Sequence, residues 1–190
     1  EMALLCDIDY VEGRVHAVQP RWAMAHNDCS IRREGARKIS EKKNWGSDSK
    51  GTAEQRIAID AFTPDGVLRN YRLVSYLYRD GVLHPYGVDS AVPSYSYFYR
   101  RLLDWLIDRF NRQEDQGPLE DLPHWFRVAG YPKQALISVG ATRYTDFGET
   151  HFLQAGDRAI VVLYDGQTYN TPRVEELLIR DEAVNSPGLS

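Results

Sequence analysis

The stretch MALLCDIDYVEGRVHAVQP, residues 2–20, decides the fold class that the sequence predicts. Residues 2–8 form a short apolar run that ends in polar residues, which is typical of a strand. Gly13 marks a turn after this run, and residues 15–20 then alternate between apolar and polar side chains, as a second strand does. The chain is therefore expected to open with a pair of strands.

Further strands are predicted along the chain. RIAIDAF, residues 56–62, alternates again, and the TPDG of residues 63–66 predicts a hairpin between it and the strand-like residues 67–77. Residues 135–140, ALISVG, are typical of a buried strand, and residues 158–166 of a last strand. Residues 31–52 carry much charge and little periodicity, so we expect an extended loop there with at most a short helix.

One long helix is expected at residues 95–112, capped by Ser94 or Ser96. Its apolar stripe consists of Phe98, Tyr99, Leu102, Leu103, Leu106, Ile107 and Phe110. Short helices are expected at residues 124–130 and 173–182. Together these elements predict a single α+β, β-rich domain over residues 1–175, followed by a C-terminal tail at residues 176–190.

Composition narrows the class of protein. The 190 residues carry a net charge of -4 and are 43% apolar, which fits one globular domain and argues against a general nucleic-acid binder. Cys6 and Cys29 are the only cysteines, and they form neither a disulfide framework nor a metal motif. No apolar run approaches the roughly 20 residues of a membrane helix. We therefore expect a cytoplasmic protein with no membrane partner. The sequence begins with Glu rather than Met and the apolar run MALLC starts at once, so we also expect a natural chain that begins upstream of Glu1.

Two residues stand out as candidates for chemistry. Asp28 follows a strand, where a carboxylate could help to hold Mg²⁺, although an Asn-Asp pair can equally stabilise a turn through its own backbone. Lys50 lies in GSDSKG and could stabilise an enolate near a metal, or could simply be solvated.

For the other candidates, too, both a functional and a structural interpretation stay open. The strand that ends in Gly140 and Thr142 could hold a substrate carboxylate, or the glycine could simply mark the start of a loop. His26 could be an acid or base but is more often structural, and Cys29 is interpreted as a small buried hydrophobe because no orienting histidine can be placed beside it. The basic residues between Arg32 and Lys43 could meet an anion or form a solvated face.

The order of these features resembles the fumarylacetoacetate hydrolase-like superfamily, in particular a bacterial branch of it. That family has Glu-x-Glu, Asn-Asp-x-Ser-x-Arg, a Trp followed by Lys-Ser-Phe, a Thr-Gly-Thr-Pro loop and Leu-x-Pro-Gly-Asp before a strand. The corresponding stretches here are Glu1–Ala3, NDCSIR at 27–32, Trp45 to Lys50, GATRY at 140–144 and FLQAGD at 152–157. The resemblance covers residues 1 to about 170.

The resemblance implies a mixed β-sandwich roll of the fumarylacetoacetate hydrolase C-terminal domain type, a homodimer, and Mg²⁺ or Mn²⁺ as cofactor. It implies that Glu1 and Asp28 are metal ligands and that Lys50 is catalytic. The residues that it places in substrate binding are Thr142, Gly140 and Arg32.

The leading functional hypothesis is therefore a divalent-metal-dependent hydrolase or lyase of a small 2-oxo or diketo carboxylic acid. The reaction would be C–C cleavage, hydration or decarboxylation through an enolate. The alternative is a non-catalytic protein that keeps the fold and binds a metabolite or partner. It is favoured by Gly51 and Arg143, which stand where the family has Ser and Pro. A local binder of nucleic acid through residues 32–43 is the third hypothesis.

Overall fold

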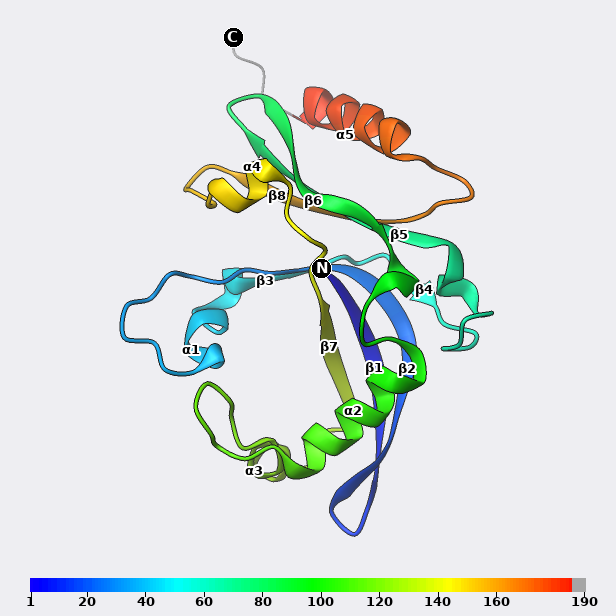
Figure 1. The fold of residues 1–190 in the computed structure, drawn as a ribbon, viewed down its shortest axis with the longest axis vertical. Helices are drawn as coiled ribbons and strands as arrows, with labels where there is room; N and C mark the ends of the chain where they lie inside the picture. Colours follow the sequence, from blue (N-terminus) through cyan, green and yellow to red (C-terminus); the bar gives the residue numbers. More distant parts are fainter. Residues whose placement is uncertain (186–190) are drawn as a thin grey trace. The chain divides into compact units, whose positions relative to one another are not determined.

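A computed structural model describes residues 1–185 (Figure 1). The chain forms two compact units. Unit 1 comprises Glu1–Arg69 and Pro93–Ala141, and unit 2 comprises Asn70–Val92 and the chain from Thr142 onward. Both units have antiparallel sheets, and strands contribute more residues than helices. The expectation of a β-rich α+β fold is thereby confirmed.

The elements follow one another without an internal repeat. In chain order they are β1 (Met2–Val11), β2 (Arg14–Asp28), α1 (Ile39–Lys43), η1 (Ser47–Ser49), β3 (Lys50–Thr52), β4 (Ile57–Ala58), η2 (Val67–Asn70), β5 (Tyr71–Arg79), β6 (Val82–Ala91), η3 (Val92–Ser94), α2 (Tyr99–Arg112), α3 (Leu122–Val128), β7 (Gln134–Gly140), α4 (Asp146–Thr150), β8 (Arg158–Asp165) and α5 (Thr171–Asn185).

The hairpin of β1 and β2 is the centre of unit 1. Glu12 and Gly13 join the two strands, and both have positive φ, as a tight two-residue hairpin turn requires. β7 pairs with the other edge of β1, while β3 and β4 both pair with β2. The predicted second strand is therefore much longer than residues 15–20, and it runs on to Asp28.

The core of unit 1 lies between this sheet and α2. Met2, Leu4 and Ile8 of β1 are buried, and α2 contributes Leu102 and Leu106. The amide of Asn111 fixes the end of α2 to β2, because it donates to Val15 O and accepts from Val15 N at 2.8 and 2.9 Å. Figure 1 shows α2 lying along the strands of unit 1.

The expected serine cap of α2 is wrong. The helix begins at Tyr99, its N-cap is Phe98 in extended conformation, and no side chain caps it. Phe98 and Tyr99 instead pack against Phe62, with ring centroids 4.9 and 5.4 Å from that ring. Aromatic packing, rather than a hydroxyl cap, fixes the start of this helix.

The predicted hairpin around residues 63–66 is also wrong. The turn itself forms, since Gly66 N donates to Thr63 O at 3.0 Å. However, Asp60 Oδ1 accepts from Val67 N at 2.9 Å and the chain continues into η2, so no strand returns beside β4. β4 pairs with β2 instead.

The strand predicted at residues 135–140 is β7, but it is not a buried strand. Its residues alternate between exposed and half-buried, and β7 stands at the end of the strand order of its sheet. The apolar run of ALISVG therefore reflects pairing with β1 on one side rather than burial on both faces.

Unit 2 is built on the sheet β6-β5-β8, with all strands antiparallel. β6 was not predicted, because Pro85 and Gly87 interrupt its pattern. Val74 and Tyr76 of the sheet form a cluster with Val174 of α5. α5 contains the short helix expected at residues 173–182 and continues to Asn185, into the stretch predicted as a tail.

No helix among residues 1–185 combines the length and the apolar character that crossing a bilayer requires.

The packing of α2 leads to a stability prediction. Leu106→Ala should lower the free energy of unfolding by about 2–5 kcal/mol, because it leaves a cavity between α2 and the sheet. Guanidinium unfolding followed by circular dichroism measures this. Arg100→Ala on the same helix, whose side chain is 91% exposed, is the control and should change stability by less than about 0.5 kcal/mol. Equal effects of the two variants would contradict the assigned burial.

Candidate functional site

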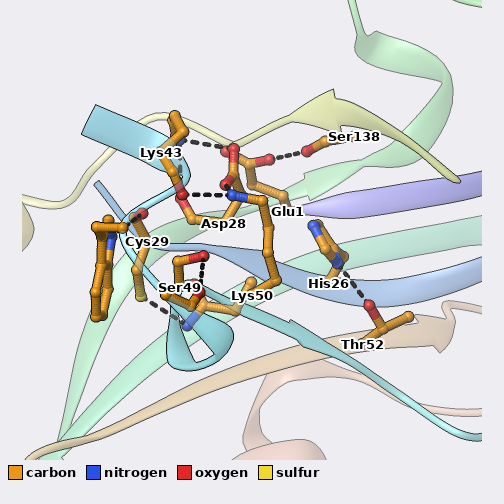
Figure 2. Close-up of polar contacts among 12 residues, drawn as sticks. Glu1, His26, Asp28, Cys29, Lys43, Ser49, Lys50, Thr52 and Ser138 are labelled. Carbon is orange, nitrogen blue, oxygen red and sulfur yellow. Dashed lines mark hydrogen bonds and ion pairs between the residues drawn. The ribbon is translucent and has the colours of Figure 1, made fainter. Parts of the chain in front are cut away.

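Three strand ends meet in unit 1 and bring together the residues predicted for chemistry. Glu1 immediately precedes β1, Asp28 ends β2 and Lys50 begins β3. The register pairs Asp28 directly with Lys50, and His26 N donates to Glu1 O at 2.9 Å. Figure 2 shows Glu1, Asp28 and Lys50 gathered at this end of the sheet.

Asp28 is the centre of the site. Its Oδ1 lies 2.7 Å from Lys50 Nζ and its Oδ2 lies 2.9 Å from Lys43 Nζ, while its side chain is only 13% exposed. Burial of Asp28 acts to raise the pKa of its carboxyl group, but the hydrogen bonds and charges of the two lysines outweigh that effect and lower the pKa. Asp28 is therefore a carboxylate at neutral pH. We refer to Asp28, Lys43 and Lys50 as the Asp28 cluster.

The two lysines are held by backbone groups as well. Lys43 Nζ donates to Asp28 O at 2.8 Å, and Lys50 Nζ donates to Lys43 O at 2.7 Å. Lys43 is the last residue of the short helix α1, so this helix places its ammonium group opposite Asp28. Lys43 was not singled out from the sequence, where it is one of several cations between residues 32 and 43.

Glu1 lies beside the Asp28 cluster. Its Oε2 accepts a hydrogen bond from Ser138 Oγ of β7, which fixes its carboxylate against the sheet. The predicted pair Glu1 and Asp28 is thus at one site (Figure 2). Among residues 1–185, however, no group of three or more His, Cys, Asp or Glu side chains could hold a metal ion.

His26 is the buried neighbour of this site, with 3% of its surface exposed. Its Nδ1 lies 2.9 Å from Thr52 Oγ1. Burial lowers the pKa of the imidazole, and the nearby carboxylates of Glu1 and Asp28 oppose that shift only in part. His26 is therefore neutral at pH 7, in keeping with the structural role favoured from the sequence.

Cys29 is half-buried, not the fully buried hydrophobe that the sequence suggested. Its Sγ accepts from Asn27 Nδ2 at 3.2 Å, and its backbone O accepts from the indole N–H of Trp45 at 3.0 Å. Its N–H donates to Ser49 O at 2.9 Å. These bonds hold the loop after β2 against η1.

The three residues predicted to bind substrate belong to different segments of the fold. Gly140 pairs with Met2 and so lies at the same end of the sheet as Glu1, where its O accepts from Tyr95 OH at 2.5 Å. Arg32 is exposed in the loop after β2. Thr142 is half-buried and belongs to unit 2. Gly140 is thus at the end of the sheet that carries Glu1.

The whole chain, residues 1–190, matches the model of a family described as a family of unknown function (DUF5718), and it belongs to that family. No curated protein and no solved structure matches the chain.

Asp28 should make stability depend on pH. Because its pKa in the folded protein is below the ordinary value of 3.8, its contribution is present at neutral pH and is lost as the pH falls through the folded pKa. Asp28→Asn should therefore destabilise unit 1 by about 1–3 kcal/mol at pH 7, and by progressively less as the pH falls below 3.8. Urea unfolding at pH 7 and at a series of lower pH values measures the difference.

Asp104→Asn is the control for this experiment. Asp104 pairs with Arg100 at 3.4 Å on the exposed face of α2, and such a pair contributes less than about 1 kcal/mol. A destabilisation by Asp28→Asn that persists unchanged at low pH would show that the lost interaction is not ionic.

Proposed function

We propose that this DUF5718 chain is the core of a hydrolase or lyase that acts on a small 2-oxo or diketo carboxylic acid through an enolate. We further propose that its sheets belong to a β-sandwich roll of the fumarylacetoacetate hydrolase type. One observation carries the proposal: Glu1, Asp28 and Lys50, which that resemblance singles out, meet at one end of one sheet although they lie far apart in the sequence.

The ammonium groups supply the chemistry that such a reaction needs. An ammonium group has three N–H donors, and the described contacts of Lys43 and of Lys50 each use two of them. The remaining donor of each lysine can reach a substrate oxygen. Lys50 would stabilise the charge that develops on the enolate oxygen, and Lys43 would hold the carboxylate of the same substrate. Asp28 orients both lysines.

Mg²⁺ or Mn²⁺ stays a prediction of the sequence. Both oxygens of Asp28 face ammonium groups, and Glu1 is bonded to Ser138. The described residues alone therefore do not fit a resident divalent ion, and no step of the proposed chemistry passes through one. When bound, such an ion would polarise an oxo-acid oxygen as a Lewis acid.

A non-catalytic binding protein is the second candidate. The observation that favours it is the closed pairing of Asp28, whose charge is already compensated by two lysines with backbone anchors. A cluster of this kind can serve as a fixed structural element or hold a metabolite without any reaction.

A measurement of turnover distinguishes the proposed enzyme from a non-catalytic binding protein. For the enzyme, a panel of 2-oxo and 2,4-diketo acids should include a substrate whose absorbance falls when the protein is added. Lys50→Ala should lower kcat/KM for it by roughly 10²–10³-fold, since Lys50 acts on the developing charge. Lys133→Ala is the control, because Lys133 lies over the ring of Tyr10, 5.5 Å from its centroid, and should keep full activity. Binding of an oxo-acid without turnover would favour the second candidate.

Calorimetry tests the metal separately. Like-charge repulsion from the lysines should make Mg²⁺ binding weak, so Lys43→Ala should tighten it severalfold and Asp28→Asn should abolish it. Asp115→Asn is the control, since Asp115 pairs with Lys38 elsewhere in unit 1. Mg²⁺ binding that survives Asp28→Asn would place the ion at other residues.

A further inference from the structure

We infer that residues 113–121 between α2 and α3, which we call the connector, hold Lys43 at Asp28 by anchoring the opposite end of α1. Lys38 and Ser40, which bind the connector, are then positioning residues for the Asp28 cluster. As a statement about substrate binding, this inference rests on the proposed function. As a statement about what holds α1 in place, it does not.

The hydrophobic core does not hold α1. None of its five residues, all of which the structure describes, is buried, and its one apolar side chain, Ile39, is 50% exposed. A helix this short is not stable in water by itself, because fixing the first turn is unfavourable and few hydrogen bonds follow. The position of α1 must therefore be set by polar contacts at its two ends.

The C-terminal end of α1 lies at the site. Lys43 ends the helix, and its Nζ lies 2.9 Å from Asp28 Oδ2. Lys42 O accepts from Ile31 N at 3.0 Å, which joins the same end of the helix to the loop after β2. The ammonium group that faces Asp28 therefore stays in place only while this end of α1 does.

The N-terminal end of α1 is bound to the connector (Figure 1). Three consecutive residues donate hydrogen bonds to it: Lys38 Nζ to Leu119 O at 2.6 Å, Ile39 N to Pro118 O at 3.0 Å, and Ser40 Oγ to Glu120 Oε1 at 2.5 Å. Lys38 also pairs with Asp115, but the side chain of Asp115 is 66% exposed and such a pair contributes little. The anchor of α1 therefore consists of the bonds to residues 118–120.

The connector is itself fixed to the rest of unit 1. Gln113 Nε2 donates to Glu120 O at 3.0 Å, and Gln113 O accepts from Leu122 N at 3.1 Å, which closes the connector into a loop at the end of α2. Asp121 caps α3 by accepting from His124 N at 2.8 Å. Because α2 packs in the core of unit 1, the connector is a firm support for α1.

The anchor affects the site by changing how often Lys43 is in place. Without it, the contacts at the C-terminal end of α1 alone would oppose the conformational entropy that the segment gains on release. Lys43 would then be away from Asp28 in a fraction of the molecules. The apparent affinity for an anion that needs Lys43 falls in proportion to the fraction in which the site is complete.

A double-mutant cycle tests this coupling. The anchor variant carries Lys38→Ala and Ser40→Ala, and calorimetry measures its affinity for oxalate. The variant should bind oxalate about threefold to tenfold more weakly than the unchanged protein, because the bonds that it lacks stabilise α1. In a Lys43→Ala background, the same two substitutions should change the affinity by less than about twofold, because the ammonium group that they position is already absent.

Lys42→Ala is the matched control. It removes one positive charge from the same helix, as the anchor variant does, but leaves the bonds to the connector intact. It should bind oxalate as the unchanged protein does. Equal weakening of oxalate binding by the anchor variant with and without Lys43 would overturn the inference, since the anchor would then act on the fold as a whole.

Hydrogen exchange provides a readout that needs no ligand. The anchor variant should speed the exchange of the Ile31 N–H, which is bonded to Lys42 O next to Lys43. The Val15 N–H, which is bonded to Asn111 of α2, is the internal control and should exchange at an unchanged rate. Unchanged exchange at Ile31 would also overturn the inference. If the unchanged protein binds no oxalate, the proposed function fails, whereas faster exchange at Ile31 alone still supports the anchor.

Discussion

The site of unit 1 depends on one electrostatic constraint, the burial of a charged carboxylate at the end of β2. A carboxylate taken out of water must be paired or it loses its charge. Asp28 is paired twice, and both partners come from the segment that follows it in the sequence. To supply them, that segment must form α1, turn through η1 and return as β3 beside β2. The conformation of residues 29–52 is thus tied to a single charge.

Local sequence signals were sufficient to predict strand pairing where a strand pairs with the next strand in the sequence. The hairpin of β1 and β2 could be predicted because Gly13 takes a positive φ between two strand-like runs. The turn at residues 63–66 carried an equally strong signal, yet β4 pairs with the distant β2 and the expected hairpin does not form. β6 escaped prediction because Pro85 and Gly87 hide its pattern, although β5 on one side is enough to hold it. Pairing between strands, rather than turn chemistry, decided these cases.

The same limit applies to the site. The sequence could nominate Asp28 and Lys50 by residue type and by resemblance, and the strand register brings them face to face. It could not nominate Lys43, because nothing in the sequence distinguishes this lysine from Lys38 and Lys42. Only the position of α1 in the fold brings Lys43 to Asp28. Nor could it foresee that the lysines would pair so closely with Asp28, since ion pairing across the sheet end depends on tertiary structure. The proposed role of the site accordingly rests more on ammonium groups than the sequence suggested.

The most direct test of this account is a crystal structure of the protein soaked with oxalate, a stable mimic of the enolate of a 2-oxo acid. Crystals with and without Mg²⁺ should be compared. The account predicts oxalate at the Asp28 cluster, with an oxygen within hydrogen-bonding distance of Lys50 Nζ and another near Lys43 Nζ. Oxalate bound away from both lysines, or no oxalate at all beside an unchanged Asp28 cluster, would contradict the claim that this cluster binds the substrate.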